Sequence, residues 1–255
     1  MAADDDPLVP MFVTQAFGLT GRPRALAGGT GRSVRVGDVV LKPVDDPAEA
    51  IWLAELQHDL HSDNVRTPRP RHSKDGRWIV DGWTASSYLP GSEQRDRWAE
   101  TIAAGRHLHS ALADVPRPDL VDARIHRWAV ADRLAWGVTD SDLAERLTAM
   151  REPLDLPSQL VHCDLSGNVL FHDGEPPAVI DLSLYRRPVP YAEAIVAVDA
   201  FLWYEAGPGV LDLIEHPDAR QLLIRAALFR WACELDPDPT ALASYEQLTD
   251  LIEQR

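Results

Sequence analysis

The spacing of apolar positions changes along the chain. In the N-terminal part, short apolar runs are separated by glycine and polar residues, which predicts two strands within residues 26–43 and a strand, turn and strand over residues 77–91. Further on, apolar residues recur at helical spacing over residues 96–112, and residues 191–203 are nearly all apolar, as in a central helix. The pattern therefore predicts a β-rich first part and a mainly helical second part.

A helix is also expected directly after the first strands. Asp46 followed by Pro47 is typical of a helix start, because proline suits the first helical position and aspartate can cap the first turn. Within this helix Glu49, Leu53 and Leu56 fall at i, i+4 and i+7, so they share one face.

Three polar residues stand close together in the second part. Residues 161–171 read VHCDLSGNVLF, and Asp181 follows ten residues later. Phosphoryl transfer requires a carboxylate to orient or deprotonate the attacking hydroxyl, and oxygen ligands to fix Mg²⁺ against a triphosphate. Asp164 would supply the first, and Asn168 and Asp181 would supply the second.

The apolar residues around these positions predict a hairpin. Residues 169–171 and 178–180 flank a turn at 172–174, so both candidate metal ligands would be carried to one edge. The alternative is that a His-x-Asp run is ordinary loop chemistry and that Asn168 only caps or turns the chain. The joint occurrence of the three residues favours a phosphoryl-transfer site.

These motifs resemble those of a known family. The segment His162-Cys163-Asp164-Leu165, followed by Gly167-Asn168 and by Ile180-Asp181, is similar to the catalytic and metal motifs of aminoglycoside phosphotransferases and their choline-kinase-like relatives. The resemblance implies a small-molecule kinase of the protein-kinase-like fold, with His162 supporting the catalytic loop.

The motif departs from the family pattern at two points. Cys163 stands where the family has glycine, and Asn168 follows Asp164 by four residues where five are usual. A shortened loop would move Asn168 relative to the metal. The same departure leaves open a pseudokinase that binds nucleotide and transfers nothing.

The resemblance also implies a lysine on an N-terminal strand to hold the phosphates. Only two of the 25 Lys and Arg residues are lysines, and Lys42 ends an apolar run, where that lysine should stand. Upstream, Gly28, Gly29 and Gly31 form a turn in which the backbone could approach the triphosphate closely.

Two further predictions concern the nucleotide. Glu49 is expected to pair with Lys42, with Glu55 as the other candidate and a solvated surface carboxylate as the alternative for either. In the resembled fold adenine lies against the hinge backbone, so residues 86–89, Ser87 and Leu89 among them, are expected to contact it mainly through main-chain groups.

The composition disfavours some classes of protein but does not identify a substrate. A net charge of −15 disfavours a nucleic-acid surface, and it would suit either a cationic substrate or simple solubility. Two cysteines are too few for a disulfide framework, which indicates reduced thiols in the cytoplasm. No apolar run approaches the roughly 18 residues of a membrane span, so membrane insertion is disfavoured.

Together these observations predict a two-lobed α+β protein-kinase-like fold. Residues 1–88 would form an antiparallel-sheet lobe that binds nucleotide, and residues 89–255 a helical lobe for catalysis and substrate. The expected reaction moves the γ-phosphoryl group of ATP or GTP, with Mg²⁺, to a hydroxyl of a small molecule such as an amino sugar or aminoglycoside. A protein kinase is the least favoured reading, because no A-P-E motif follows Asp181.

One acidic residue in an apolar helix needs a partner. Asp199 lies within the apolar segment 191–203, where burying a carboxylate is costly unless it is hydrogen-bonded. We expect it to brace the catalytic loop through backbone N–H groups, with a helix cap or partial exposure as the alternative.

Overall fold

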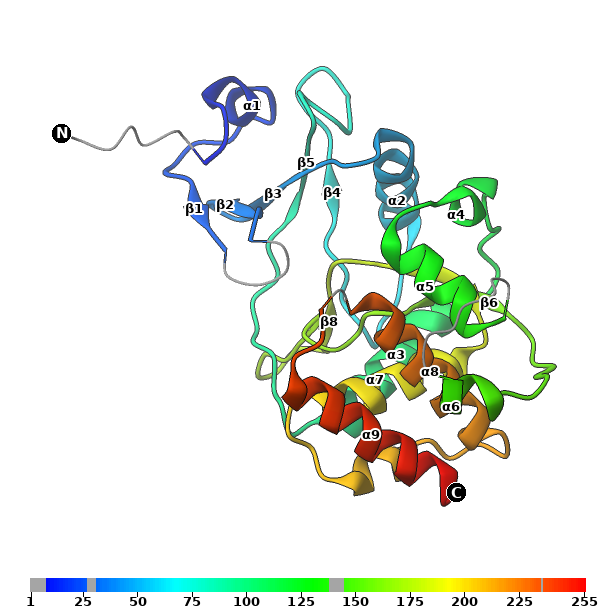
Figure 1. Ribbon diagram of the computed structural model, residues 1–255. Coiled ribbons are helices and arrows are strands. Elements are labelled where there is room, and N and C mark those ends of the chain that lie inside the picture. Colours follow the sequence, from blue (N-terminus) through cyan, green and yellow to red (C-terminus); the bar gives the residue numbers. More distant parts are fainter. Residues whose placement is uncertain (1–7, 27–30, 138–144, 235) are drawn as a thin grey trace. The chain divides into compact units, whose positions relative to one another are not determined.

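The computed structural model describes residues 8–26, 31–137, 145–234 and 236–255 (Figure 1). The chain divides into two compact units, Met1–Gly91 and Ser92–Arg255, called unit 1 and unit 2 below. Each unit has its own secondary structure, described in turn.

Unit 1 is built on a five-stranded antiparallel sheet of order β1-β2-β3-β5-β4. The central strand β3 pairs with β2 on one side and with β5 on the other. The strands are β1 (Arg24–Ala25), β2 (Val34–Val36), β3 (Val39–Pro43), β4 (Pro70–Arg71) and β5 (Trp83–Ser87).

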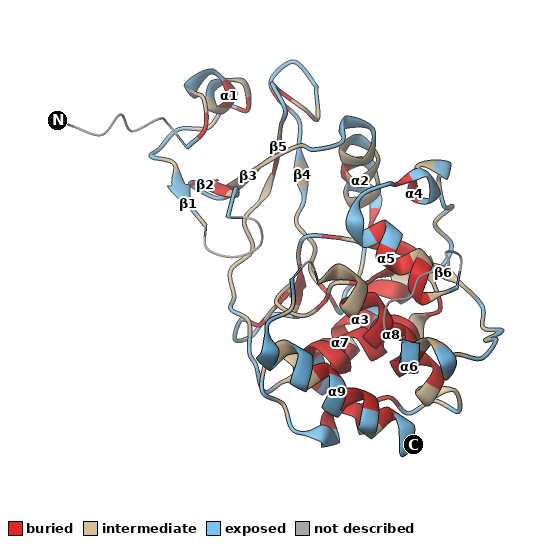
Figure 2. Ribbon diagram, in the orientation of Figure 1, coloured by how far each residue is buried: buried red, intermediate tan, exposed pale blue. Residues whose placement is uncertain are grey.

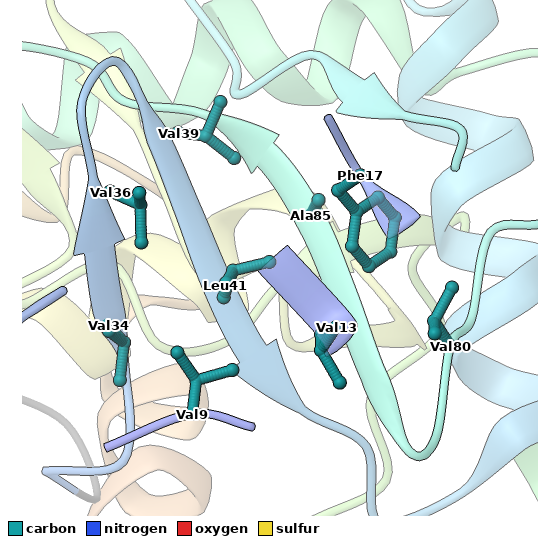
Figure 3. Packing of buried hydrophobic residues seen from close by; sticks show 9 residues of the cluster. All are labelled: Val9, Val13, Phe17, Val34, Val36, Val39, Leu41, Val80 and Ala85. Atoms are coloured by element: carbon teal, nitrogen blue, oxygen red, sulfur yellow. The ribbon is translucent and has the colours of Figure 1, made fainter. Parts of the chain in front are cut away.

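The core of unit 1 lies on one face of this sheet. Val34 pairs with Leu41, and Leu41 pairs with Ala85, so these side chains share a face because residues directly opposite one another point the same way. Helix α1 (Met11–Ala16) adds the buried Val13 to that face. Figure 3 shows the cluster: Val9, Val13, Phe17, Val34, Val36, Val39, Leu41, Val80 and Ala85.

Helix α2 (Pro47–Asp59) begins where the sequence predicts. Asp46 is its N-cap, and the Asp46 side chain accepts hydrogen bonds from the backbone N–H groups of Ala48 and Glu49. Pro47 occupies the first helical position, whose N–H would have no partner within the helix.

One predicted strand of unit 1 is wrong. Residues 77–80 form no strand, and Val80 makes only an isolated bridge to Trp83 across a turn at Asp81 and Gly82. Both turn residues have positive φ, +47° and +73°, as a tight two-residue hairpin turn requires. The second predicted strand is β5, and its outer neighbour is β4.

Unit 2 is mainly helical and contains two short pairs of strands. Strand β6 (Gln159–His162) pairs with β9 (Leu184–Arg187), and β7 (Val169–Leu170) pairs with β8 (Ala178–Val179), all antiparallel. The α-helices are α3 (Trp98–Ala111), α4 (Asp119–Ala123), α5 (Arg127–Ala135), α6 (Glu145–Ala149), α7 (Val189–Trp203), α8 (Ala219–Cys233) and α9 (Pro239–Glu253), with a 3-10 turn, η1 (Pro208–Leu213).

The core of unit 2 is formed by α7 and its neighbours. Residues 191–200 of α7 and 221–230 of α8 are all buried, and Figure 2 shows the buried colour concentrated on these two helices. Helix α7 packs against α8 and α3. Strands β6 and β8 contact α3, and β6 also contacts α7, so the loops between these strands lie next to this core. In the described residues no helix is long and apolar enough to cross a bilayer.

Candidate active site

The predicted catalytic loop lies between β6 and β7 in unit 2. Its start is fixed to the strand pair, because Cys163 N donates to the carbonyl of Ser183, one residue before β9 (3.0 Å). Asp164 follows with a side chain that is 48% exposed, so a substrate can reach its carboxylate. Leu165, the next residue, is buried next to Gly105.

Asn168 contacts Asp164 twice despite the shortened spacing. Its Nδ2 donates to the Asp164 carbonyl (2.7 Å) and to Asp164 Oδ2 (3.2 Å). Both partners are acceptors, so the amide orientation is determined: nitrogen faces Asp164, and the oxygen Oδ1 is the atom available to a cation. The four-residue spacing thus keeps Asn168 beside Asp164.

The hairpin that follows joins Asn168 to the third predicted residue. Strands β7 and β8 pair as expected, and Ile180 N donates to the carbonyl of Asn168 (2.9 Å). This bond sets Asp181, the next residue, beside the end of the catalytic loop. Asp181 is exposed and has a φ of +55°, in the left-handed region that costs a non-glycine residue about 1–3 kcal/mol.

The oxygen atoms of Asp181 and Asn168 fit an Mg²⁺ site that phosphate oxygens of a bound nucleotide would complete. Within the described ranges no group of three or more His, Cys, Asp or Glu side chains could hold a metal by itself. Mg²⁺ normally takes one or two carboxylates together with substrate phosphates and water. One carboxylate at Asp181 and one amide oxygen at Asn168 match that requirement.

Asp199 braces the catalytic loop, but through an arginine. The backbone contacts expected for it are wrong: Asp199 accepts from Arg230 Nε and Nη2, both at 2.6 Å, in a bidentate pair between α7 and α8. The same Nη2 also donates to Asp164 Oδ1 (3.0 Å). Arg230 therefore links the buried Asp199 to the half-exposed Asp164.

Burial and charge act in opposite directions on Arg230. Burial lowers the pKa of its guanidinium, but the neighbouring carboxylates, Asp199 foremost and then Asp164, together outweigh burial and hold that pKa well above its ordinary value. The rings of Trp203 and Phe229 lie 5.1 and 5.0 Å from Arg230 Cζ. Arg230 is thus a permanent positive charge beside the Asp164 carboxylate.

Two buried, neutral histidines lie at the start of this loop, where His162 is predicted to have a supporting role. His162 is fully buried, its N–H donates to His109 Nε2 (2.9 Å), and its Nδ1 accepts from Ser183 N (3.1 Å). Each ring therefore accepts a backbone N–H, which requires a neutral imidazole. Burial lowers the pKa of His162 and lowers that of His109 to about 3. His107, in contrast, is exposed.

Close approach of α3 completes this support. A Cβ added to Gly105 would lie 2.5 Å from Leu165 Cδ1, so Leu165 would have to move if this position of α3 carried a side chain. Cys163, in the place of the family's glycine, is buried, and burial raises the pKa of its thiol well above the ordinary value. Cys163 is therefore a packing residue and no nucleophile.

The phosphate-holding candidates belong to unit 1. Lys42 lies in β3 opposite Thr84, on the sheet face opposite the core, and is half-buried. On α2, Glu49 is half-buried and Glu55 is exposed, which favours Glu49 as the partner of Lys42. Gly31 has a φ of +70°, whereas Gly28 and Gly29 lie outside the described residues.

Ser87 and Leu89 line a pocket of about 260 Å³ in unit 1, together with Leu60, Ser62, Val65, Arg66, Thr67 and Arg69. Main-chain groups nearby are already used: Ser87 N donates to Arg69 O, and Tyr88 N donates to Asp38 O. A main-chain donor to adenine would therefore be the N–H of Leu89. The adenine contacts themselves remain a prediction.

Comparison with known proteins defines the class. The sequence matches the phosphotransferase enzyme family over residues 25–242, and the chain therefore belongs to that family. No curated protein matches the chain.

Solved structures share its fold. An aminoglycoside phosphotransferase from Alicyclobacillus acidocaldarius is 15% identical with a TM-score of 0.61, covering 98% of this chain and 94% of that one. A choline/ethanolamine kinase family protein from Mesorhizobium loti is 16% identical with a TM-score of 0.60 (96% and 91%). A thermostable aminoglycoside phosphotransferase mutant, in a ternary complex with ADP and hygromycin B, is 16% identical with a TM-score of 0.57 (95% and 97%). The predicted protein-kinase-like fold and family are thus confirmed.

Arg230 is the site residue that sequence reasoning missed. The sequence shows that Asp199 needs a partner, and the apolar segment 222–233 contains two arginines, Arg225 and Arg230, as candidate cations. Pairing the two requires knowing that α7 packs on α8, which local spacing does not reveal.

Proposed function

We propose that the protein transfers the γ-phosphoryl group of ATP or GTP to a hydroxyl of a small molecule. The observation that carries this proposal is the placement of Asp164. Its carboxylate is half-exposed, is bonded on one oxygen by Arg230 and on the other by Asn168, and lies in the same loop and hairpin as Asp181.

Membership of the phosphotransferase enzyme family supports the reaction type. The nucleotide and the acceptor are supported by analogy: one structural neighbour holds ADP and hygromycin B together. The panel of acceptors described below tests which hydroxyl compound this protein uses.

In the proposed reaction Asp164 orients the acceptor hydroxyl and takes its proton. The acceptor oxygen forms a bond to the γ-phosphorus while the bond from that phosphorus to the bridging oxygen of ADP breaks, and the electron pair leaves with ADP. Catalysis then rests on positioning and electrostatics, with no covalent intermediate on the protein.

The remaining residues hold the phosphates. Lys42 would contact them as a point charge, kept in place by Glu49, and the turn containing Gly28, Gly29 and Gly31 would cover them. Asp181 and Asn168 Oδ1 would hold Mg²⁺. When bound, this ion neutralises charge on the phosphate oxygens.

For the acceptor we propose a chemical class, and for the protein a cellular compartment. Acceptors with an amine beside the hydroxyl, such as amino sugars and aminoglycosides, are the first to test because the chain carries a net charge of −15. Reduced Cys163 and Cys233 support a cytoplasmic location.

A pseudokinase is not favoured. A nucleotide-binding protein without catalysis would have no need of an exposed carboxylate held on both oxygens, and the short loop does not separate Asn168 from Asp164.

The test begins with ADP release measured over a panel of amino sugars, aminoglycosides, sugars and amino alcohols, beside a no-acceptor control. Asp164→Asn should then lower kcat by about 10²–10⁴-fold, the usual contribution of a positioned acid–base group. Mg·ATP affinity should stay close to wild type, because Asp164 acts only during transfer. No acceptor-dependent ADP release, combined with Mg·ATP binding and an unchanged Asp164→Asn variant, would establish the pseudokinase instead.

A further inference from the structure

We propose that Arg230 is a positioning residue that fixes the Asp164 carboxylate for catalysis, and that Asp199 holds Arg230 in place for this purpose. The proposal rests on the proposed function, since it assigns a role in that same reaction. Arg230 lies on α8, 66 residues away from Asp164 in the sequence.

One nitrogen of Arg230 connects the two carboxylates. Nη2 donates to Asp199 Oδ2 at 2.6 Å and to Asp164 Oδ1 at 3.0 Å, while Nε donates to Asp199 Oδ1 at 2.6 Å. The two bonds to Asp199 fix the plane of the guanidinium. Because one hydrogen of Nη2 bonds Asp199, the direction of the other hydrogen is fixed, and it points to Asp164.

Burial makes this arrangement rigid. Asp199 is fully buried, and the Arg230 side chain is 6% exposed against 48% for Asp164. Only the Asp164 end of the network reaches solvent, so it is the end where a substrate can bind. A base held on a buried support keeps its position when substrate arrives.

The opposite oxygen of Asp164 is held independently. Asn168 Nδ2 donates to Oδ2 at 3.2 Å, so each carboxylate oxygen has one donor from a different element. Rotation of the carboxylate would break one of these bonds. Arg230 and Asn168 together thus define the plane in which Asp164 meets the acceptor hydroxyl.

A second bidentate pair between an arginine and a buried aspartate serves as a control. Arg187 Nε and Nη2 donate to the two oxygens of the buried Asp132, joining β9 to α5. This pair makes no bond to Asp164. If Arg230 and Asp199 only tied two helices together, replacing Arg230 should act as replacing Arg187 does.

The first readout does not need turnover. The side-chain amide signals of Asn168 in a nitrogen–proton correlation spectrum, identified by their loss in Asn168→Ala, report on the carboxylate that they contact. Arg230→Lys keeps the positive charge but lacks the planar guanidinium that bonds both carboxylates, so these signals should shift. Arg187→Lys should leave them in place. Where Arg230→Lys does not fold by circular dichroism, Arg230→Gln takes its place.

The second readout separates positioning from stability. Arg230→Lys should lower kcat by about 10- to 100-fold, the cost of a slightly misplaced group, with the KM for ATP changed less than about twofold. In an Asp164→Asn background the same replacement should cause no further loss, because its effect acts through Asp164. Arg187→Lys should have the same small effect in both backgrounds.

The outcomes distinguish this proposal from the function on which it rests. Unmoved Asn168 amide signals in the Arg230 variants, or losses of kcat that multiply in the Asp164→Asn background, would overturn the positioning role. If wild type shows no acceptor-dependent ADP release, the kinase function fails, and the amide signals alone then decide whether Arg230 positions Asp164.

Discussion

Asp181 is an exposed carboxylate on a left-handed backbone, directly after a two-stranded hairpin. A left-handed backbone destabilises a non-glycine residue, and such strain is typically retained at functional positions such as a fixed metal ligand. Asp181→Asn should weaken Mg²⁺-dependent ATP binding by at least about tenfold, because a neutral amide lacks the charge that a hard cation prefers.

Calorimetric titration with Mg·ATP measures this change. The matched control is Asp173→Asn, which changes an exposed aspartate in the turn of the same hairpin and should leave the affinity unaltered. Equal affinities in wild type and Asp181→Asn would remove Asp181 from the metal site.

Lys42 and Lys74 are the two lysines of the chain, so one can serve as the control for the other. Lys42 lies in β3, whereas Lys74 is exposed in a loop. Lys42→Ala should lower kcat/KM by about 10²–10³-fold, as expected for losing an electrostatic contact to the phosphates, with little change in melting temperature.

Lys74→Ala should keep full activity in the same assay. Lys42→Arg should restore only part of it, since a planar guanidinium does not replace a point charge in a fitted site. Full activity of Lys42→Ala would contradict its phosphate-holding role.

At the scale of elements, a hydrogen bond from the backbone N of His162 to Nε2 of the buried His109 joins β6 to α3. Burial lowers the pKa of His109 to about 3, against about 6.5 in an unfolded chain. Below pH 6.5 the unfolded chain therefore binds a proton that the folded chain does not. The free energy of unfolding should fall as pH decreases from 6.5, by about 1.4 kcal/mol per pH unit for this group.

Urea unfolding of wild type and His109→Gln between pH 7.5 and 5 tests this dependence. Glutamine retains an acceptor for His162 N, so the variant should fold with a pH slope reduced by about that amount. His172→Gln, at an exposed position, should keep the wild-type slope. An unchanged slope in His109→Gln would show that His109 does not titrate on unfolding.

Elements with strong local signals were predicted well. Asp46 and Pro47 mark the start of α2, and the apolar runs around His172 mark the β7–β8 hairpin. The strand expected at 77–80 is wrong because Val80 joins the core next to a tight turn and bridges Trp83 across that turn, without pairing along a strand. The local spacing of apolar residues indicates burial in this segment. Whether the segment pairs as a strand depends on its neighbours in the sheet, which local spacing does not show.

At the scale of the molecule, each unit has its own hydrophobic core. Leu41 is fully buried in unit 1 and Leu223 in unit 2. Leu41→Ala should cost about 2–5 kcal/mol, from lost burial and the cavity left behind. The loss should be local, because the contacts of Leu41 belong to the cluster of unit 1.

Hydrogen exchange measured residue by residue tests this division. Leu41→Ala should speed exchange in β2, β3 and β5 and spare α7 and α8, and Leu223→Ala should do the reverse. Equal acceleration throughout the chain in either variant would mean that the two cores unfold as one unit.

The sequence by itself determined the residues whose chemistry is local. Asp164, Asn168 and Asp181 stand within a short stretch around one hairpin, so their spacing alone predicts that they meet, and Lys42 is marked by the apolar run that it ends. The roles of these residues stay predictions, but their placement on loop, hairpin and strand is as expected.

Only the tertiary structure decided what supports Asp164. Arg230, Asp199 and His109 are far from it in sequence and reach it, directly or through a partner, because α7, α8 and α3 pack together. Periodicity shows that a helical face is buried, but it does not show which face meets which neighbour. Buried polar groups must find partners across such contacts, and so the carboxylate of Asp199 is satisfied by Arg230 and not by the backbone of the loop.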